Sequence, residues 1–321
     1  SVITWGSSTN GGDSSSGSAS LDGSTPVISI GSNGSAFAAL RSDGSVITWG
    51  FGTNGGNSSS VSSSLDGSTP VISISSTSRA FAAIRSDSSV ITWGDSTKGG
   101  DSSSVSADID GSTPVTSISS TTGAFAAIRS DGSVTTWGYS NGGNSSSVAT
   151  DIDGSKPVIS ISSTERAFAA LRLDGSVITW GNSEFGGDST SVSSSLDGSI
   201  PVISISSNNF AFAALRLDGS VITWGSSSGA DSSSVSSSIN GSTPVVSISS
   251  TPTAFAAIRS DGSVITWGDS TKGGDSSSVS ASIDGSTPVI SIHSNNFAFA
   301  VIRSDGSVIS WGNSSSGGAV S

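Results

Sequence analysis

Hydrophobic residues come in short bursts that recur along the chain, separated by segments rich in serine and glycine. Three bursts keep returning in variants: "AFAAIR" (as at 254–259), "SVITWG" (as at 263–268) and "PVISIS" (as at 70–75). Each is short, apolar and rich in β-branched or aromatic residues, which favours β-strands. No segment keeps the 3.6-residue period of an amphipathic helix, and glycine, serine, threonine and valine all disfavour helix interiors. The pattern predicts an all-β protein.

The repeat spacing indicates the architecture. Successive Trp-Gly pairs lie 43 or 44 residues apart, at Trp5, Trp49, Trp93, Trp137, Trp180, Trp224, Trp267 and Trp311. A period of this size is typical of a solenoid or a propeller. Four strands of about five or six residues with four turns fill one such unit, if "DSSSVS" (as at 101–106) is a fourth, weaker strand. We therefore predict an all-β, seven-bladed β-propeller with four-stranded antiparallel blades, as a single domain over 1–321.

Turn residues and side-chain alternation support the strand assignment. Asp-Gly joins "AFAAIR" to "SVITWG" in six of the seven units, the exception being Asp87-Ser88, and this dipeptide is the strongest short-range hairpin signal. Along the "AFAAIR" strand, Phe255 and Ala257 face one side and Ala256 and Ile258 the other, so both faces are apolar. We expect this strand to be the innermost one of a blade, and Trp267 to fill the wider space between blades.

The segment "AFAAIRSDGSVITWG" at 254–268 resembles the signature of the regulator-of-chromosome-condensation repeat family, whose members form seven-bladed β-propellers. The resemblance covers all seven units. The chain departs from the family where "GGDSS" or "GGNSS" replaces the usual Gly-Gln-Leu-Gly segment, in its shorter units, and in lacking the histidine that often precedes the small-residue strand. It also lacks the basic surface on which the founding member's nucleotide exchange depends. The resemblance implies the fold and, since family members commonly bind proteins, a protein partner.

The two ends of the chain carry the same strand. Residues 1–306 make seven full units, and residues 307–321 begin an eighth with "SVISWG", although the chain already starts with "SVITWG". A closed ring of seven blades has room for only one of these strands. Three arrangements follow: a closed ring with an adjusted end, a head-to-tail assembly of several molecules, or an open or longer array.

Composition and charge argue against several functions. The net charge of −12 disfavours a nucleic-acid partner and an acidic membrane surface. No apolar run approaches the roughly 18 residues of a membrane span, so we expect no membrane insertion. Without cysteine there is no thiol nucleophile and no cysteine-bound zinc. The only histidine, His293, stands where other units have serine or glycine, so no catalytic triad is indicated. We predict a protein that is not an enzyme and binds no cofactor.

Charged residues in the turns have two interpretations. An aspartate follows each recurring arginine by two residues, which fits either ion pairs that orient the turns or a ring of charge that binds an anion; the arginines are Arg41, Arg85, Arg129, Arg172, Arg216, Arg259 and Arg303. The densest acidic clusters, Asp108 with Asp110 and Asp151 with Asp153, lack the spacing of known calcium loops and are typical of turns. We therefore predict no metal site.

Positions at which the units differ are candidates for recognition, because binding residues often lie in loops on a rigid scaffold. Neutral drift explains the same scatter. The candidates in these loops are Arg79, Glu165, Arg166, Phe210, Phe297, Phe51, Tyr139 and Phe185. Candidate N-glycosylation sequons begin at Asn33, Asn57, Asn144, Asn240 and Asn313.

Two functions remain open. The first is a non-enzymatic structural or surface module, extracellular, that assembles with copies of itself through its duplicated terminal strands. The second is a propeller that binds a protein or a glycan through its variable loops. The polar surface, low in lysine, favours an extracellular or cell-surface location, and a cytoplasmic one stays open.

Overall fold

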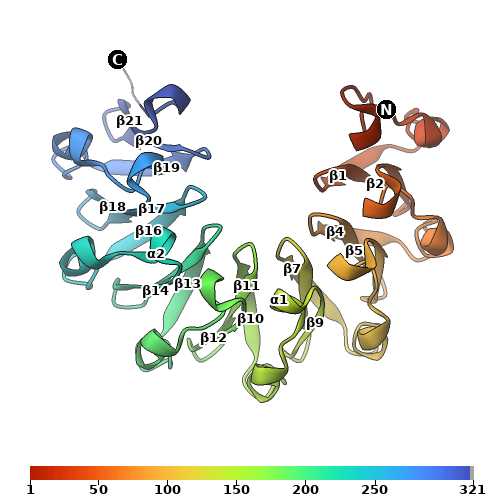
Figure 1. Ribbon diagram of the computed structural model, residues 1–321, viewed down its shortest axis with the longest axis horizontal. Helices are drawn as coiled ribbons and strands as arrows, with labels where there is room; N and C mark the ends of the chain where they lie inside the picture. Colours follow the sequence, from red (N-terminus) through yellow and green to blue (C-terminus); the bar gives the residue numbers. More distant parts are fainter. Residues whose placement is uncertain (319–321) are drawn as a thin grey trace. The chain divides into compact units, whose positions relative to one another are not determined.

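The computed structural model describes residues 1–318, apart from the side chains of residues 16–18. The chain divides into two compact units, Ser1–Ile159 and Ser160–Ser321, which are drawn in red to yellow-green and in green to blue in Figure 1. The boundary falls inside one β-strand, β10 (Val158–Ser163). Each unit is described by itself below.

The strands form seven antiparallel sheets, the blades of a seven-bladed β-propeller, and each sheet has three strands in chain order. In the first unit the strands are β1 (Val27–Ser32), β2 (Ala36–Arg41), β3 (Val46–Gly50), β4 (Val71–Ser76), β5 (Ala80–Arg85), β6 (Val90–Gly94), β7 (Val115–Ser120), β8 (Ala124–Arg129) and β9 (Val134–Gly138). After β10 follow β11 (Ala167–Arg172), β12 (Val177–Gly181), β13 (Val202–Ser207), β14 (Ala211–Arg216), β15 (Val221–Gly225), β16 (Val245–Ser250), β17 (Ala254–Arg259), β18 (Val264–Gly268), β19 (Val289–Ser294), β20 (Ala298–Arg303) and β21 (Val308–Gly312).

The predicted fourth strand is wrong. The "DSSSVS" segments form short 3₁₀-helices, because their polar side chains bond to the local backbone instead of leaving it free for a sheet. Asn57 Oδ1, for example, accepts from the backbone N–H of Ser59 at 3.0 Å, and Val61 N–H donates to Ser58 O at 3.0 Å. These helices are η2 (Ser15–Ser20), η4 (Ser59–Ser64), η6 (Ser103–Asp108), η7 (Ser146–Asp151), η9 (Thr190–Ser195), η10 (Ser233–Ser238) and η12 (Ser277–Ser282).

A second short helix precedes each of these, directly after the Trp-Gly pair. It is 3₁₀ in η1 (Ser8–Asn10), η3 (Gly52–Asn54), η5 (Ser96–Lys98), η8 (Ser183–Phe185), η11 (Ser270–Lys272) and η13 (Ser314–Ser316). In the two loops that are one residue shorter, it is a single α-turn, α1 (Ser140–Gly143) and α2 (Ser227–Ala230).

The "AFAAIR" strand is the middle strand of every sheet, not the innermost one as predicted. In the sixth sheet, Phe255 of β17 pairs with Trp267 of β18, and Ala257 pairs with Ile248 of β16 on the other side. The expectation failed because an apolar strand with two buried faces fits any position between neighbouring sheets, and the pattern alone does not say which edges are covered. Small residues here let the sheets on both sides approach closely.

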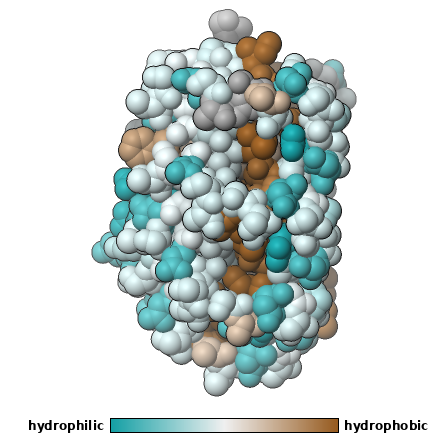
Figure 2. Space-filling view, turned by 90° about the vertical axis from the view of Figure 1, so that its right-hand side faces the viewer, coloured by the Kyte–Doolittle hydropathy of each residue, from teal (hydrophilic) through white to brown (hydrophobic). Residues whose placement is uncertain are grey.

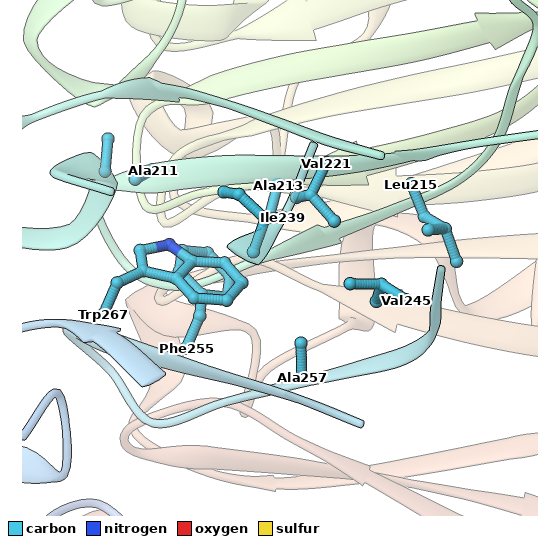
Figure 3. Close-up of a cluster of buried hydrophobic side chains, with 10 residues drawn as sticks. Ala211, Ala213, Leu215, Val221, Ile239, Val245, Phe255, Ala257 and Trp267 are labelled. Atoms are coloured by element: carbon cyan, nitrogen blue, oxygen red, sulfur yellow. The ribbon is translucent and has the colours of Figure 1, made fainter. Parts of the chain in front are cut away.

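Internal sheets within each unit bury opposite faces against their neighbours, as the alternation predicted. Figure 3 shows the cluster between the fifth and sixth sheets, in which Ala213 and Leu215 of β14 lie opposite Phe255 and Ala257 of β17 and Trp267 of β18. The Phe255 and Trp267 rings stack with centroids 5.3 Å apart, and Trp267 is 1% exposed. The same combination of an alanine face and a Phe/Trp face recurs between other sheet pairs. This apolar burial is the main stabilising contribution to the fold.

Hydrogen bonds repeat with the same offset. The indole N–H of Trp93 donates to Gly55 O at 3.1 Å, 38 residues earlier, and Trp49, Trp137, Trp224 and Trp311 make the same bond to Gly11, Gly99, Gly186 and Gly273. The acceptor must be glycine, since its φ is +99° at Gly55 and a Cβ there would lie 2.6 Å from Phe81 Cδ2. On the edge strands, Ser76 Oγ donates to Ser32 O at 2.8 Å, 44 residues earlier.

The sixth sheet departs from this pattern. Among the described residues, Trp267 Nε1 and Asn208 Nδ2 are buried donors with no acceptor. Ala230 stands where every other loop has the second glycine of a Gly-Gly pair. A Cβ at this position would crowd the backbone: a Cβ built on Gly143, the equivalent residue of the other short loop, would lie 2.6 Å from Gly138 O. Both short loops make an α-turn, but Gly229 beside Ala230 lacks the positive φ that Gly142 keeps (+113°) beside Gly143. The carbonyl that would accept from Trp267 is thereby turned away.

Candidate functional site

The hairpin turns hold the recurring arginines in a fixed network. Arg41 Nε donates to Ser45 Oγ at 2.7 Å, Ser45 Oγ donates to Asp43 Oδ1 at 2.6 Å, and Arg41 Nη2 lies 3.5 Å from Asp43 Oδ2. The hydrogen bonds that Ser45 donates hold the pKa of Asp43 below its ordinary value. Arg85, Arg216, Arg259 and Arg303 make the same ion pair with the aspartate two residues later. Arginine donors turned inward onto the turn itself favour a turn-orienting role over anion binding.

Arg129 pairs differently, and Arg172 is more deeply buried than the others. Arg129 pairs with Asp108 at 3.5 Å while its Nε keeps the bond to Ser133 Oγ at 2.7 Å. Arg172 is 6% exposed, and its Nη1 donates to Ser176 Oγ at 3.5 Å. The aspartates of the "ADIDG" segment therefore serve turns: Asp110 Oδ1 accepts from Ser112 N–H at 2.8 Å. Within residues 1–318, no group of three or more His, Asp or Glu side chains is close enough together to hold a metal ion.

The variable loops pair their cations with aromatic rings. Lys98 Nζ lies 3.9 Å from the centre of the Tyr139 ring, and Lys272 Nζ lies 5.8 Å from that of Phe297. Each of these pairs joins loops of neighbouring repeats. Tyr139 and Phe297 stay 44% and 41% exposed, so each ring covers a cation on one side and faces solvent on the other.

The remaining loop candidates lie in the same kind of contact. Arg166 lies 4.9 Å from the centre of the Phe185 ring, which in turn packs against Phe210 at 5.2 Å between centroids. Glu165 accepts from Asn209 Nδ2 at 2.9 Å. Arg79 lies 3.8 Å from Asp95, whereas Phe51 is 47% exposed and stacks on no other aromatic ring within the described part of the chain.

The sequon asparagines fall into two groups. Asn33 is engaged through both ends of its amide, since Nδ2 donates to Asn54 O at 2.7 Å and Oδ1 accepts from Ala36 N–H at 2.8 Å. Asn57, Asn144 and Asn240 are exposed, and each uses only Oδ1, as the aspartate does at the same place in other repeats. Asn313 is half-buried, and its Oδ1 accepts from Ser315.

His293 lies exposed in β19, opposite Ala300 of β20. It borders a cavity of about 220 Å³ that is lined further by Ser294, Asn295, Ala298, Phe299, Ala300 and Gly317. Neither a carboxylate nor a second titratable group lines this cavity, so the histidine has no partner for acid–base chemistry there. The cavity matters instead as part of an uncovered sheet face.

That face belongs to the seventh sheet, and we call it the C-terminal face: Ala300, Ile302 and Val308, with Ala298 buried at its end. Its equivalents in the sixth sheet are 0–7% exposed because the seventh sheet covers them. On the C-terminal face Val308 is 48% exposed. Within the described residues, the loop after this sheet has no phenylalanine packed against it: a Cβ on Gly317 would meet none, whereas a Cβ on the equivalent Gly273 would lie 2.6 Å from Phe299. This sheet therefore presents an alanine face without a Phe/Trp face opposite it.

The first unit presents the converse at its N-terminal end, which we call the N-terminal notch: Val2, Ile3, Trp5, Phe37 and Trp49. It is a cavity of about 240 Å³ lined also by Thr4, Gly11 and Ile30. Leu21, Ala39 and Trp49 form its buried floor, and Trp5 is 83% exposed although all other tryptophans are 1–3% exposed. The notch is a Phe/Trp face without an alanine face opposite it.

Sequence reasoning found the duplicated strand but neither exposed face. The only available signal was that the first strand precedes any "AFAAIR" segment, so that it has no middle strand to pair with. Figure 2 shows one side of the molecule, where pale residues dominate, a narrow band of apolar residues runs along the middle and single apolar residues lie outside it. Further exposed apolar residues lie on the first strands of the sheets, among them Ile28, Ile72 and Ile290. Among the described residues, no helix is long and apolar enough to span a membrane.

No family model matches the sequence, and no curated protein does either. Among solved structures, the ectodomain of the receptor kinase CR4 from Physcomitrella patens is 15% identical, with 88% of this chain and 72% of that chain covered and a TM-score of 0.47. Prp20p from Saccharomyces cerevisiae is 16% identical (76% and 72% covered, TM-score 0.46), and yeast RCC1 (Prp20) bound to Kap60 is 16% identical (75% and 70% covered, TM-score 0.45). These likenesses concern the fold alone. The seven antiparallel sheets of the structure itself confirm the predicted seven-bladed β-propeller.

Proposed function

We propose that this RCC1-like propeller is a non-enzymatic structural module that assembles with copies of itself, head to tail. The observation that carries the proposal is the pair of exposed faces. The C-terminal face offers the alanine half of the interface that internal sheets bury, and the N-terminal notch offers the Phe/Trp half. Two different, complementary surfaces on one chain make a heterologous contact, which joins copies into rings or filaments.

The alternative to a second copy is contact between the two faces of one chain. Within its own unit, Val308 of the C-terminal face is 48% exposed, and Trp5 of the N-terminal notch is 83% exposed, whereas Trp49 of the notch is 2% exposed. Contact within one chain gives a closed monomer and contact between copies gives an oligomer, so the oligomeric state decides between them.

Sedimentation velocity or native mass spectrometry over a range of concentrations tests the proposal. The wild-type chain should form multiples of 31.4 kDa that grow with concentration. Ala300→Arg should remain a monomer, because the equivalent Ala256 is 0% exposed in its interface and leaves no room for a longer side chain. Since Ala300 is uncovered within its own chain, the substitution should not unfold the protein.

Ser304→Arg is the matched control. It places the same charge on the same sheet, at a turn position whose equivalents Leu173 and Leu217 are 69% and 67% exposed even between internal sheets. This variant should assemble like the wild type. A wild-type protein that stays at 31.4 kDa at every concentration would overturn the head-to-tail assembly.

Recognition of a protein or glycan partner by the variable loops is the second candidate. It is favoured by aromatic rings that are held by neighbouring cations yet remain open to solvent, above all Tyr139 and Phe297. Phe297→Ala should then abolish capture of a partner from the natural source, and Phe51→Ala, outside these pairs, serves as the control. Unchanged capture by Phe297→Ala would exclude this surface. The exposed sequons and the weakly charged surface support an extracellular or cell-surface setting for either function.

A further inference from the structure

One turn of the chain differs from its six equivalents by a single functional group. In six repeats an aspartate and a glycine precede the segment that leads into the first strand; the aspartates are Asp22, Asp66, Asp110, Asp153, Asp197 and Asp284. The turn before β16 has Asn240 instead. Asn240 Oδ1 accepts from Ser242 N–H at 2.9 Å, just as Asp66 Oδ1 accepts from Ser68 N–H at 2.8 Å. This turn therefore already has the shape that holds a carboxylate in the other repeats.

The residue after Asn240 is glycine for a backbone reason. Gly241 has a φ of +91°, and a Cβ on it would lie 3.0 Å from Asp218 O. An asparagine before glycine is chemically unstable, because the glycine nitrogen carries no neighbouring side chain that would block its approach to the asparagine Cγ. A reaction between two groups of one chain segment is fast, since they are already close together. The fold thus requires at residue 241 the residue type that leaves this reaction unhindered.

The chain has several Asn-Gly pairs, and the structure distinguishes them; they begin at Asn10, Asn33, Asn54, Asn141 and Asn240. In the three that lie in the loops after Trp-Gly, the glycine is buried. In the pair that begins at Asn33, Nδ2 donates to Asn54 O and Oδ1 accepts from Ala36 N–H. Among the described residues, only the pair at Asn240 combines an exposed asparagine, an amide nitrogen without an acceptor and a glycine that is not buried.

We propose that Asn240 is a site of spontaneous deamidation, at which the chain converts its own asparagine to aspartate. The nitrogen of Gly241 loses its proton to solvent and bonds to Asn240 Cγ, and the side-chain nitrogen leaves as ammonia. Water that breaks the new Cγ–N bond then gives aspartate, whereas water that breaks the original backbone C–N bond gives isoaspartate. The sum is one water consumed and one ammonia released, and one added carboxylate takes the net charge from −12 to −13.

The folded turn suits aspartate better than isoaspartate. Hydrogen bonds from Ser286 hold the pKa of the equivalent Asp284 below its ordinary value, so a carboxylate at residue 240 is ionised at neutral pH. Isoaspartate would lengthen the main chain by one carbon directly after Ile239, whose carbonyl accepts from Val221 N–H at 2.8 Å. Aspartate therefore restores the pattern of the other repeats, and isoaspartate disturbs it. The reaction needs no enzyme and does not depend on whether copies of the chain assemble.

The test uses the full chain from a host without N-glycosylation, because a glycan on Asn240 would prevent the loss of ammonia. The folded protein is incubated at mildly alkaline pH, peptide mass spectrometry follows each asparagine, and isoelectric focusing follows the added charge. Asn240 should convert at least about tenfold faster than Asn33, where ring closure must first break two hydrogen bonds. The rate should rise with pH, since the attacking nitrogen must lose its proton.

The same protein unfolded in guanidinium chloride is the matched control. Every pair has glycine as the attacking residue, so the rates should converge once the fold no longer protects the other asparagines. Asn240→Gln should abolish the fast charge shift of the folded protein, because a side chain one carbon longer closes its ring much more slowly. Asn240→Asp should focus with the converted form. If Asn33 converts as fast as Asn240 in the folded chain, or Asn240 converts only after unfolding, the inference is wrong.

Discussion

Among the described residues, Ser88 is the only residue other than glycine with a positive φ, at +65°. It occupies the hairpin turn between β5 and β6, where the other sheets have a glycine with φ between +77° and +82°. A Cβ at this position also crowds the next repeat, to 2.5 Å from Pro288 Cβ in the case of Gly262. The turn yields accordingly, since Val115 N–H lies 3.1 Å from Ser88 O and the equivalent Val71–Gly44 bond measures 2.9 Å. Ser88→Gly should therefore stabilise the protein.

The expected gain is modest and can be measured. Relief of the left-handed conformation contributes about 1–2 kcal/mol. The greater freedom of glycine in the unfolded chain offsets about 0.4–1 kcal/mol of it. The net increase in the free energy of unfolding is then about 0.8 kcal/mol at mid-range (about 0–1.6 kcal/mol over the full ranges), or a rise in Tm of up to about 4 °C.

Urea and thermal unfolding, followed by circular dichroism, measure this change. Gly132→Ser is the converse variant in the neighbouring sheet and should lose a comparable amount, since a Cβ on Gly132 would collide with Pro157. The double variant should return close to the wild-type stability. If Ser88→Gly is no more stable than the wild type while Gly132→Ser costs nothing, the strain at this turn is not real and the reasoning fails.

Three further predictions rest on other features. Ala230→Gly should restore the positive φ of Gly229 and an acceptor for Trp267 Nε1. We expect about 1 kcal/mol of added stability and slower hydrogen exchange of the Trp267 indole N–H. Unchanged exchange of this indole would contradict the prediction. Hydrogen bonds from Ser45 and Ser89 lower the pKa of Asp43 and Asp87 in the folded chain. The stability that these two carboxylates contribute is therefore present at neutral pH and is lost as the pH falls below the ordinary pKa of 3.8. Thermal unfolding at a series of acidic pH values, followed by circular dichroism, measures this loss, and a melting temperature that stays constant through this range would refute the prediction. In a secretory eukaryotic host, peptide mass spectrometry should find glycans on Asn57, Asn144 and Asn240 and none on Asn33, whose amide nitrogen is bonded to Asn54 O; the reverse distribution would refute the accessibility argument.

Much of the fold was predictable, because every repeat carries the same pattern of apolar positions. The alternation in "AFAAIR" predicted two buried faces, and the Asp-Gly pairs predicted the hairpins. The "DSSSVS" helices were missed since their cause is a side-chain oxygen bonding the nearby backbone, which hydrophobic periodicity does not register. The loop pairs, such as Lys98 with Tyr139, join neighbouring repeats and leave no local signal. The exposed end faces follow from which strand lacks a partner, and only the structure shows it.

The bonds between neighbouring sheets have a consequence for how the chain reaches its fold. Trp49 reaches back 38 residues to Gly11, and Ser76 reaches back 44 residues to Ser32, so a newly made unit finds its partner groups on the unit just before it. Such short-range connectivity favours fast folding and stepwise growth from an ordered unit. During synthesis from the N-terminus, each sheet would therefore pack against the preceding sheet as it leaves the ribosome. A destabilising defect in one repeat would stop this stepwise folding at that repeat and leave the preceding sheets folded.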